Sequence, residues 1–310
     1  MRSIVTGGAG FIGSHLVDHL VSAGDDVIVI DSLVSGDINS IRDHLDSKKV
    51  TLVSADLLSD SWQHHLAGAG RVYHLAADPD VRESAVSPDK QLNNTIIATH
   101  RVLEAMRKYG VPEIVFTSTS TVYGEATAIP TPESYTPMEP VSVYGAAKLA
   151  CEALISAYAH SFSMKAWIFR FANIIGARSG HGVITDFIRK LRENPNELEI
   201  LGDGKQTKSY LEITECIRAI LYAASHSTNT VNTFNVGSED WISVTEIADI
   251  LTSEMGLNPK YRYTGGSRGW VGDVPKMQLD VTKLKESGYI PQISSRESVR
   301  VAVRAALESS

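Results

Sequence analysis

The sequence predicts an α/β protein in which a doubly wound parallel sheet is joined to a smaller α/β lobe. Short apolar runs of strand length alternate with amphipathic segments of helix length through the first half of the 310 residues. This alternation is typical of parallel sheets whose strands are connected by helices. A glycine-rich loop also separates the first strand from the first helix. Because the alternation weakens later, we predict a first domain at 1–172 and a second at 173–310, with some segments of the second returning to the first.

The amino-terminal unit consists of a strand, a glycine loop, a helix and a second strand. Ser3–Val5 is predicted to be a short buried strand, and the loop Thr6–Gly13 follows with the spacing Gly-x-x-Gly-x-x-Gly. Ser14–Ala23 carries apolar residues at helical spacing. The run Val27–Ile30 is the next strand, and it ends at the acid Asp31. This order of elements is typical of a Rossmann-type dinucleotide-binding domain.

Three further strands and a long amphipathic helix follow. The strands are predicted at Val50–Val53, Arg71–Leu75 and Glu113–Phe116, and the helix at Asn94–Tyr109. In a doubly wound sheet the ligand crevice lies at the carboxyl ends of the strands. The residues at those ends are therefore candidates for ligand contacts: Asp56, Leu57, Leu75, Ala76, Ala77, Thr117, Ser118 and Thr119.

The glycine loop and Asp31 together indicate NAD as the cofactor. Glycine lets the backbone turn tightly and approach a pyrophosphate, whose charge is met by the amino end of the following helix. The acid hydrogen-bonds the adenosine ribose hydroxyls and repels a 2′-phosphate, so NAD is favoured over NADP. The predicted cofactor-binding residues are Gly7, Gly10, Phe11, Ile12, Gly13, Asp31, Asp56, Leu57, Leu75, Ala76, Ala77, Ser118, Tyr144 and Lys148.

Composition and charge argue against several other classes of protein. The chain is 43% hydrophobic and 21% charged with a formal net charge of −7, which is ordinary for a globular protein and does not recommend nucleic acid as a partner. The two cysteines, Cys151 and Cys216, lack metal-ligand spacing, so we expect no disulfide framework and no metal. No apolar run approaches the ~18–20 residues of a membrane span, and no secretory signal is visible. We therefore expect a cytoplasmic protein without a membrane partner.

Tyr144 and Lys148, in the run Tyr-Gly-Ala-Ala-Lys, are four residues apart and therefore share one face of a helix. A tyrosine phenol normally titrates near pH ~10. A lysine one turn away, together with the positive nicotinamide ring of NAD, is expected to lower the tyrosine pKa. Such a tyrosine can take a proton from a hydroxyl while a hydride leaves the same carbon. Taken alone, the pair also fits a solvated tyrosine beside a solvated lysine.

Seven motifs in order give the chain a resemblance to the extended short-chain dehydrogenase/reductase family. Within it, the chain is most similar to the NAD-dependent nucleotide-sugar epimerases that interconvert UDP-glucose and UDP-galactose. The motifs extend over nearly the whole chain: Thr-Gly-Gly-Ala-Gly-Phe-Ile-Gly (6–13), His-Leu-Ala-Ala (74–77), Thr-Ser-Thr-Ser-Thr-Val-Tyr-Gly (117–124), Tyr-Gly-Ala-Ala-Lys (144–148), Arg-Phe-Ala-Asn-Ile-Ile-Gly (170–176), Gly-Asp-Gly-Lys-Gln-Thr-Lys-Ser-Tyr-Leu (202–211) and Arg-Gly-Trp-Val-Gly-Asp-Val (268–274).

The resemblance implies a role for each residue at a matching position. Tyr144 would be the general base and acid, and Lys148 would hold the nicotinamide ribose and lower the tyrosine pKa. Thr119 would hydrogen-bond the reacting sugar oxygen. Asn173 matches a residue that contacts the substrate diphosphate. The implied reaction is a reversible oxidation at the sugar 4-position with tightly bound NAD.

The residues after Thr119 favour epimerisation over related reactions. Relatives that act as 4,6-dehydratases place Asp-Glu directly after this threonine, and the decarboxylases keep a Glu just before the Val-Tyr-Gly. Such acids provide the extra proton transfers that elimination and decarboxylation require. This chain has Ser120 and Thr121 there, which cannot do so.

The second half departs from the family pattern at two positions that bear on substrate binding. Lys208 stands where many epimerases have an arginine facing the diphosphate, and lysine keeps the charge but loses the bidentate fork. Trp270 stands where many have a phosphate-binding arginine, and we expect Arg268 to take over that charge. The predicted substrate-binding residues are Thr119, Asn173, Lys208 and Arg268.

Other functions stay open at this point. They are a 4-epimerase of UDP-N-acetylglucosamine or UDP-glucuronate, a net NAD-dependent oxidoreductase of hydroxysteroid type, and a non-catalytic NAD-binding regulator or RNA-binding relative. Because relatives pair two helices across a dimer, those from Asn94 and around Tyr144, we also expect a homodimer.

Overall fold

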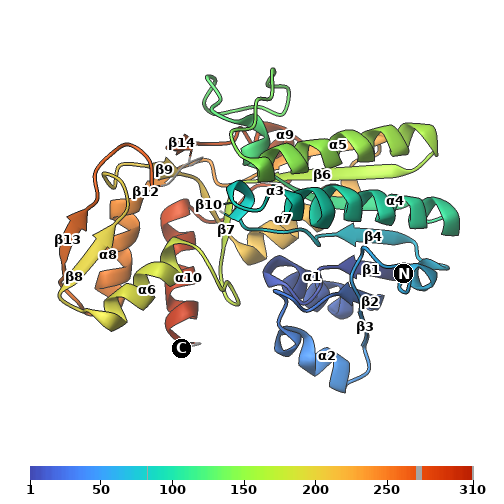
Figure 1. The fold of residues 1–310 in the computed structure, drawn as a ribbon, viewed down its shortest axis with the longest axis horizontal. Coiled ribbons are helices and arrows are strands. Elements are labelled where there is room, and N and C mark those ends of the chain that lie inside the picture. The colour runs from blue at the N-terminus through green and yellow to red at the C-terminus, as the bar shows by residue number, and fades with distance from the viewer. Residues whose placement is uncertain (82, 270–273, 309–310) are drawn as a thin grey trace.

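The computed structural model describes residues 1–81, 83–269 and 274–308 and has a seven-stranded sheet at its centre (Figure 1). Neighbouring strands are parallel throughout, in the order β11-β6-β5-β4-β1-β2-β3. This confirms the predicted doubly wound α/β fold. The strands are β1 Arg2–Thr6, β2 Asp26–Asp31, β3 Val50–Ser54, β4 Arg71–His74, β5 Glu113–Thr119, β6 Lys165–Phe171 and β11 Val231–Val236.

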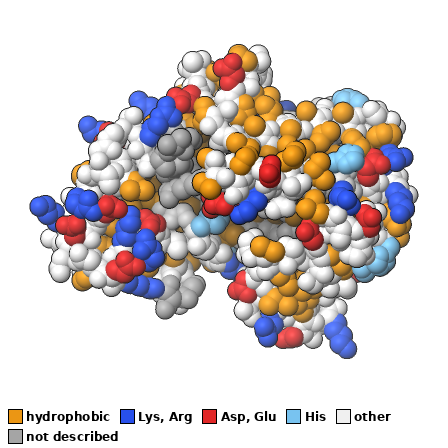
Figure 2. Space-filling view, in the orientation of Figure 1, with side chains coloured by type: hydrophobic (Ala, Val, Ile, Leu, Met, Phe, Trp, Pro, Cys, Tyr) orange, Lys and Arg blue, Asp and Glu red, His pale blue; other side chains and the backbone are white. Residues whose placement is uncertain are grey.

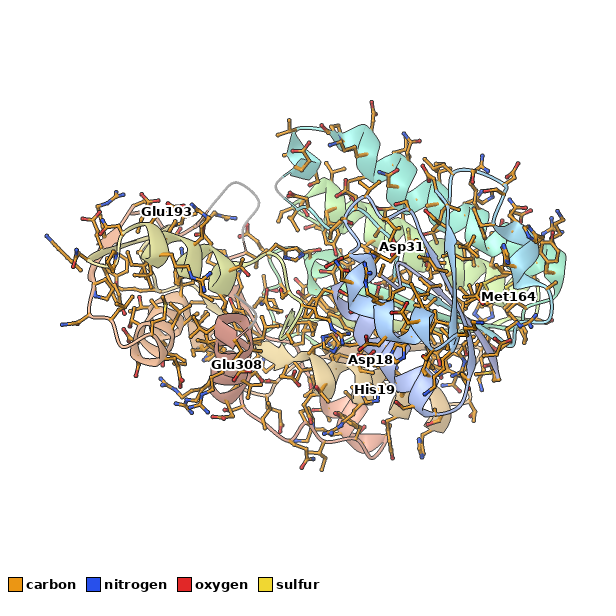
Figure 3. All side chains as sticks on the ribbon, turned by 90° about the horizontal axis from the view of Figure 1, so that it is seen from below. Asp18, His19, Asp31, Met164, Glu193 and Glu308 are labelled. Atoms are coloured by element: carbon orange, nitrogen blue, oxygen red, sulfur yellow. The ribbon has the colours of Figure 1, made fainter. Side chains whose placement is uncertain are left out.

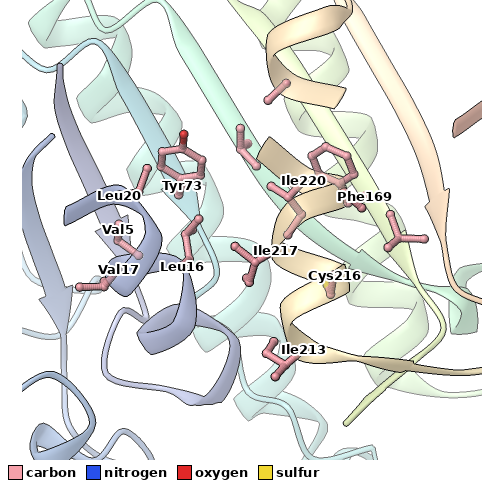
Figure 4. Packing of buried hydrophobic residues seen from close by; sticks show 14 of the residues in the cluster. Val5, Leu16, Val17, Leu20, Tyr73, Phe169, Ile213, Cys216, Ile217 and Ile220 are labelled. Atoms are coloured by element: carbon pink, nitrogen blue, oxygen red, sulfur yellow. The ribbon is translucent and has the colours of Figure 1, made fainter. Parts of the chain in front are cut away.

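Hydrophobic layers cover both faces of the sheet because successive strand residues point to opposite sides. On one face, Val5 and Phe169 belong to a core with residues of α1 and α7 (Figure 4). On the other, Ile4 and Ile168 pack with residues of α4 and α5. The helices of this domain are α1 Phe11–Ser22, α2 Arg42–Asp46, α3 Pro88–Gln91, α4 Ala98–Tyr109, α5 Val143–Ser161, α7 Ile213–His226 and α9 Thr282–Glu286, with 3₁₀ turns at Ile38–Ile41, Gln63–Leu66, Glu83–Ala85 and Ser120–Tyr123.

The helix predicted at Asn94–Tyr109 is not regular over its whole length. It opens as a π-helix, Leu92–Ile97, and continues as α4. The Thr99 hydroxyl donates to the Thr95 carbonyl at 2.7 Å, the oxygen that an α-helix offers to the backbone N–H of Thr99. Side-chain competition of this kind disturbs regular helical bonding. The apolar periodicity, which gave the prediction, carries no signal for it.

The second half forms a smaller lobe with its own core, at the left of Figure 1. Ile188 of α6, Leu251 of α8 and Val299 of α10 pack together there. Its elements are β7 Asn173–Ile175, α6 Val183–Glu193, β8 Glu197–Ile200, β9 Thr207–Lys208, β10 Tyr210–Glu212, β12 Ile242–Ser243, α8 Val244–Glu254, β13 Lys260–Tyr263, β14 Lys276–Met277 and α10 Ser295–Glu308.

Segments from beyond residue 172 complete the large domain. The strand β11 pairs with β6, and α7 packs beside α1 over the same face of the sheet. Both come after β10, so the chain leaves the large domain, enters the smaller lobe and returns. Among the described helices, none is long and apolar enough to cross a membrane.

A buried ion pair joins the elements at the centre of the large domain. The carboxylate of Glu152, on α5, accepts hydrogen bonds from the Arg170 guanidinium of β6, with Nη2 at 2.6 Å from Oε2. Ser118 of β5 also donates to this carboxylate, and Arg170 donates to the Tyr123 hydroxyl at 2.9 Å. Both charged side chains are less than a tenth exposed. Such a pair is stable only when further hydrogen bonds satisfy both partners, as they do here.

Replacing Arg170 by methionine should therefore destabilise the protein by roughly 3–5 kcal/mol, because it leaves the Glu152 charge buried without a cation. The double variant Glu152→Gln, Arg170→Met should recover much of that loss, since no unpaired charge remains. Urea unfolding of both variants beside the wild type measures the difference. A single variant that loses less than about 1 kcal/mol would contradict the importance of the pair.

Candidate active site

The glycine loop between β1 and α1 leaves no room for side chains. Gly7 has φ of +71°, and a Cβ built on it would lie 2.7 Å from the Ala76 backbone nitrogen. A Cβ on Gly13 would lie 2.1 Å from the Gly7 carbonyl oxygen. Within the described chain, no side chain caps α1 and no acid lies in its first turn. The amino end of α1 therefore offers unsatisfied N–H groups and a positive dipole, which suit a pyrophosphate.

Asp31, at the end of β2, holds the glycine loop in place. Its carboxylate accepts the backbone N–H of Ala9 at 2.9 Å and that of Leu33 at 2.8 Å, and the residue is buried. A carboxylate oxygen accepts more than one hydrogen bond, so these contacts leave acceptor capacity for ribose hydroxyls. Asp56, after β3, is exposed and accepts the N–H of Leu58. The ribose role of Asp31 and the adenosine contacts of Asp56 stay predictions.

The three predicted catalytic residues come together at the carboxyl end of β5. Thr119 is the last residue of that strand, and its side chain lies close enough to Tyr144, in the first turn of α5, to act on the tyrosine pKa. The Thr119 hydroxyl accepts from the Thr121 hydroxyl at 3.1 Å. The Ser142 hydroxyl accepts the Gly145 N–H at 3.1 Å and so begins α5 just before Tyr144. Lys148, one turn along, donates from Nζ to the Thr117 carbonyl at 2.9 Å. Tyr144 and Lys148 thus share one helix face, and both reach the end of β5.

The protein's own groups keep Tyr144 protonated. Burial raises the pKa of Tyr144 to about 12, and the nearby Thr119 side chain opposes this only in part. Burial also lowers the pKa of Lys148 to about 8, opposed by the nearby Cys151 and Glu152. The expectation that Lys148 together with bound NAD lowers the tyrosine pKa stays a prediction.

The Ser118 hydroxyl donates to the buried Glu152 carboxylate, and the cofactor contact of Ser118 stays a prediction. The sequence reasoning gave no role to Glu152 or Arg170. One signal was available, since Glu152 lies four residues after Lys148 and so shares its helix face. A carboxylate on the buried side of a helix requires a partner.

His74 is a second buried residue to which the sequence reasoning gave no role. Its Nδ1 lies 2.7 Å from the Thr6 hydroxyl and its Nε2 lies 2.9 Å from the Thr99 hydroxyl. Burial lowers the pKa of His74 to about 3, so the ring is neutral. Because Thr99 donates to the Thr95 carbonyl, its oxygen accepts from Nε2–H, and Nδ1 accepts from Thr6. This chain of hydrogen bonds links the glycine-loop strand to α4.

The predicted substrate-binding residues fall into two places. Asn173 donates to the Ser209 carbonyl at 3.1 Å, which brings it beside Lys208 of β9. Arg268 instead donates to the Glu125 carboxylate of the large domain at 2.6 Å. Trp270, which replaces the arginine whose charge Arg268 is expected to supply, lies outside the described residues. The diphosphate roles of Asn173, Lys208 and Arg268 stay predictions.

The sequence of the chain matches a known protein family that uses NAD, in agreement with the geometry of the glycine loop. The model of the NAD dependent epimerase/dehydratase family matches residues 3–237. The chain belongs to this family. Its cofactor is NAD, and the fit of the glycine loop and α1 to a pyrophosphate agrees with that.

Relatives of known structure cover the whole chain. The crystal structure of a UDP-galactose 4-epimerase shares 42% identity with a TM-score of 0.90, covering 100% of this chain and 99% of that one. UDP-glucose 4-epimerase of Thermotoga maritima, solved with UDP-glucose, shares 32% identity with the same TM-score and coverage. UDP-glucuronic acid 4-epimerase of Bacillus cereus, solved with UDP-glucuronic acid and NAD, shares 26% identity with a TM-score of 0.90 and covers 100% of both chains. By sequence, the UDP-glucose 4-epimerase of Mycolicibacterium smegmatis is 30% identical over 98% of this chain and 97% of its own.

Spectroscopic titration of the NAD-free protein should detect no ionisation of Tyr144 below about pH 10, because burial holds its pKa near 12. The measurement is the phenolate absorbance near 295 nm of the wild type minus that of Tyr144→Phe, which removes the signal of the other tyrosines. A step of one tyrosine below pH 9 would show that the protein alone produces the phenolate.

Proposed function

We propose that the protein interconverts UDP-glucose and UDP-galactose by a transient oxidation at the sugar 4-position. The observation that carries this proposal is the meeting of Thr119, Tyr144 and Lys148 at the carboxyl end of β5, beside a loop that fits the pyrophosphate of NAD. The 42% and 32% identity to solved epimerases of UDP-galactose and UDP-glucose supports the choice of substrate.

Each of the three residues has a defined task in this reaction. Tyr144, as the phenolate that bound NAD would favour, takes the proton of the sugar 4′-hydroxyl and later returns it to the 4-keto sugar. Thr119, close to Tyr144, orients the reacting oxygen and relays the proton. Lys148 contributes a positive charge and hydrogen-bonds the nicotinamide ribose. When bound, NAD supplies reversible acceptance of the hydride at C4.

The sugar must present both of its faces between the two hydride transfers, so the site has to hold the nucleotide while the ring turns. Asn173 and Lys208, neighbours through Ser209, are suited to hold the diphosphate. Arg268 can join them only after its guanidinium leaves Glu125. The residues after Thr119 offer hydroxyls and no carboxylate, which favours reversible oxidation over elimination.

We also propose a homodimer. Large hydrophobic side chains gather on the face over α4 and α5 in Figure 2. Those that are exposed include Leu92 and Ile97 in the turns before α4, and Val143 and Phe162 at the two ends of α5. Burying such a patch against a second copy removes apolar surface from water.

Sedimentation equilibrium should give twice the chain mass of 33.7 kDa, and the single chain mass would contradict the homodimer.

Incubation of the purified protein with UDP-galactose, without added cofactor, should yield UDP-glucose by NMR. The variant Tyr144→Phe should lose at least about 100-fold in kcat, because the proton acceptor is gone while the fold is kept. Unfolding curves of both proteins control for stability. Turnover of UDP-N-acetylglucosamine or UDP-glucuronate in place of UDP-galactose, with NAD supplied, would overturn the substrate assignment and keep the 4-epimerase reaction.

A further inference from the structure

The turn after β7, residues Gly176, Ala177 and Arg178, leaves the smaller lobe and reaches α1 of the cofactor domain. Two consecutive residues of the turn contact α1. The Ala177 carbonyl accepts from His15 Nε2 at 2.9 Å, and Arg178 Nη1 donates to Asp18 Oδ2 at 2.8 Å. His15 and Asp18 are three residues apart and share one face of α1. We name these contacts the α1 clasp.

The backbone of the turn is held in an unusual conformation. Arg178 has φ of +65°, which is unfavourable for a residue with a side chain. A Cβ on Gly176 would lie 2.4 Å from the Ile213 side chain, so the turn presses on the start of α7. The turn therefore packs against the start of α7 through Gly176 and hydrogen-bonds α1 through Ala177 and Arg178.

The clasp lies close to both predicted binding regions. His15 is in the first half of α1, and its ring contacts that of Phe11, a predicted cofactor-binding residue, at 5.9 Å between centroids. On the other side, Gly176 lies three residues after Asn173, a predicted substrate contact. Figure 3 shows Asp18 on the cofactor domain, and Glu193 marks the smaller lobe. Moving the turn away from α1 requires the clasp to break.

The charges facing the clasp support a neutral His15 and a charged pair. Burial lowers the pKa of His15, and Arg178 lowers it further, against the opposing effects of the Ala177 carbonyl, Asp18 and Glu212; the net shift is downward, so the ring is a neutral donor at Nε2. Asp18 also accepts from His44 of α2, at 2.7 Å. The side chains of Asp18 and Arg178 are each about a third exposed, at 34% and 35%. A pair with this exposure contributes little to overall stability, so its loss need not unfold the protein.

We propose that the α1 clasp closes the smaller lobe onto the cofactor domain and keeps NAD bound between turnovers. The proposal rests on the proposed function, in which one NAD serves many cycles. Asp18 and Arg178 are therefore positioning residues for the cofactor and touch neither of the reacting groups.

The test is the rate at which bound NAD exchanges with radiolabelled NAD in the absence of any sugar nucleotide. The variants Asp18→Ala and Arg178→Ala should each raise this rate roughly three- to tenfold, the effect expected from losing one partly exposed ion pair. The double variant should exchange no faster than the faster single variant, because both changes break the same contact. Arg178→Lys should recover part of the loss by keeping a charge.

The matched control is Arg189→Ala, which removes ion pairs of similar length to Asp186 and Glu193 within α6. It should leave the exchange rate unchanged, since these pairs do not join the two lobes. The variant His44→Ala removes the other hydrogen-bond partner of Asp18 and keeps Arg178. It therefore shows how much of the Asp18→Ala effect comes from losing the contact with His44. Wild-type rates in both clasp variants, additive effects in the double variant, or equal acceleration by Arg189→Ala would overturn the proposal.

NAD exchange is measured without substrate. The experiment can therefore reject the role of the clasp and the assignment of the substrate independently of each other. Faster exchange in a protein that does not convert UDP-galactose would support the clasp and reject only the assigned sugar. A wild-type protein that already exchanges its NAD within the mixing time would overturn the clasp, whatever sugar it converts.

Discussion

The buried ion pair between Glu152 and Arg170 is the constraint on which the arrangement of the active site depends. It joins α5 to β6, and through Ser118 it also joins both to β5. The catalytic residues lie on two of these elements, Thr119 at the end of β5 and Tyr144 at the start of α5. Because buried charges tolerate little change in geometry, the pair fixes how α5 is seated on the sheet. The proximity of Thr119 to Tyr144 follows from that seating.

The same burial that fixes the geometry also sets the protonation states. It raises the pKa of Tyr144 to about 12 and lowers that of Lys148 to about 8, so the protein alone holds a neutral phenol beside a lysine that loses its charge easily. Both shifts oppose the reactive pairing of phenolate and ammonium. The reactive state therefore requires additional stabilisation of the phenolate, which the positive nicotinamide ring is suited to provide. Proton transfer is in this way tied to the presence of the oxidant.

The sequence was sufficient to predict the parallel sheet, because strands and helices alternate with distinct periods and Gly7, Gly10 and Gly13 mark the first turn. It also identified Tyr144 and Lys148, whose spacing places them on one helix face. The partner of Glu152 could not be predicted, since Arg170 lies on a different element, β6, and meets Glu152 only through the packing of α5 on the sheet. The direction of the Tyr144 pKa depends on burial, which local spacing does not report. The contact of Arg178 with Asp18 joins positions 160 residues apart and has no local signal.

The most direct test of the central claim, that oxidation and reduction occur at one sugar carbon within one closed site, is isotope tracing. UDP-galactose carrying deuterium at C4 is converted by the purified protein in ordinary water, and the product is analysed by NMR. The account predicts UDP-glucose that keeps the deuterium at C4, because the hydride removed is returned to the same carbon. Product with hydrogen from water at C4 would contradict it.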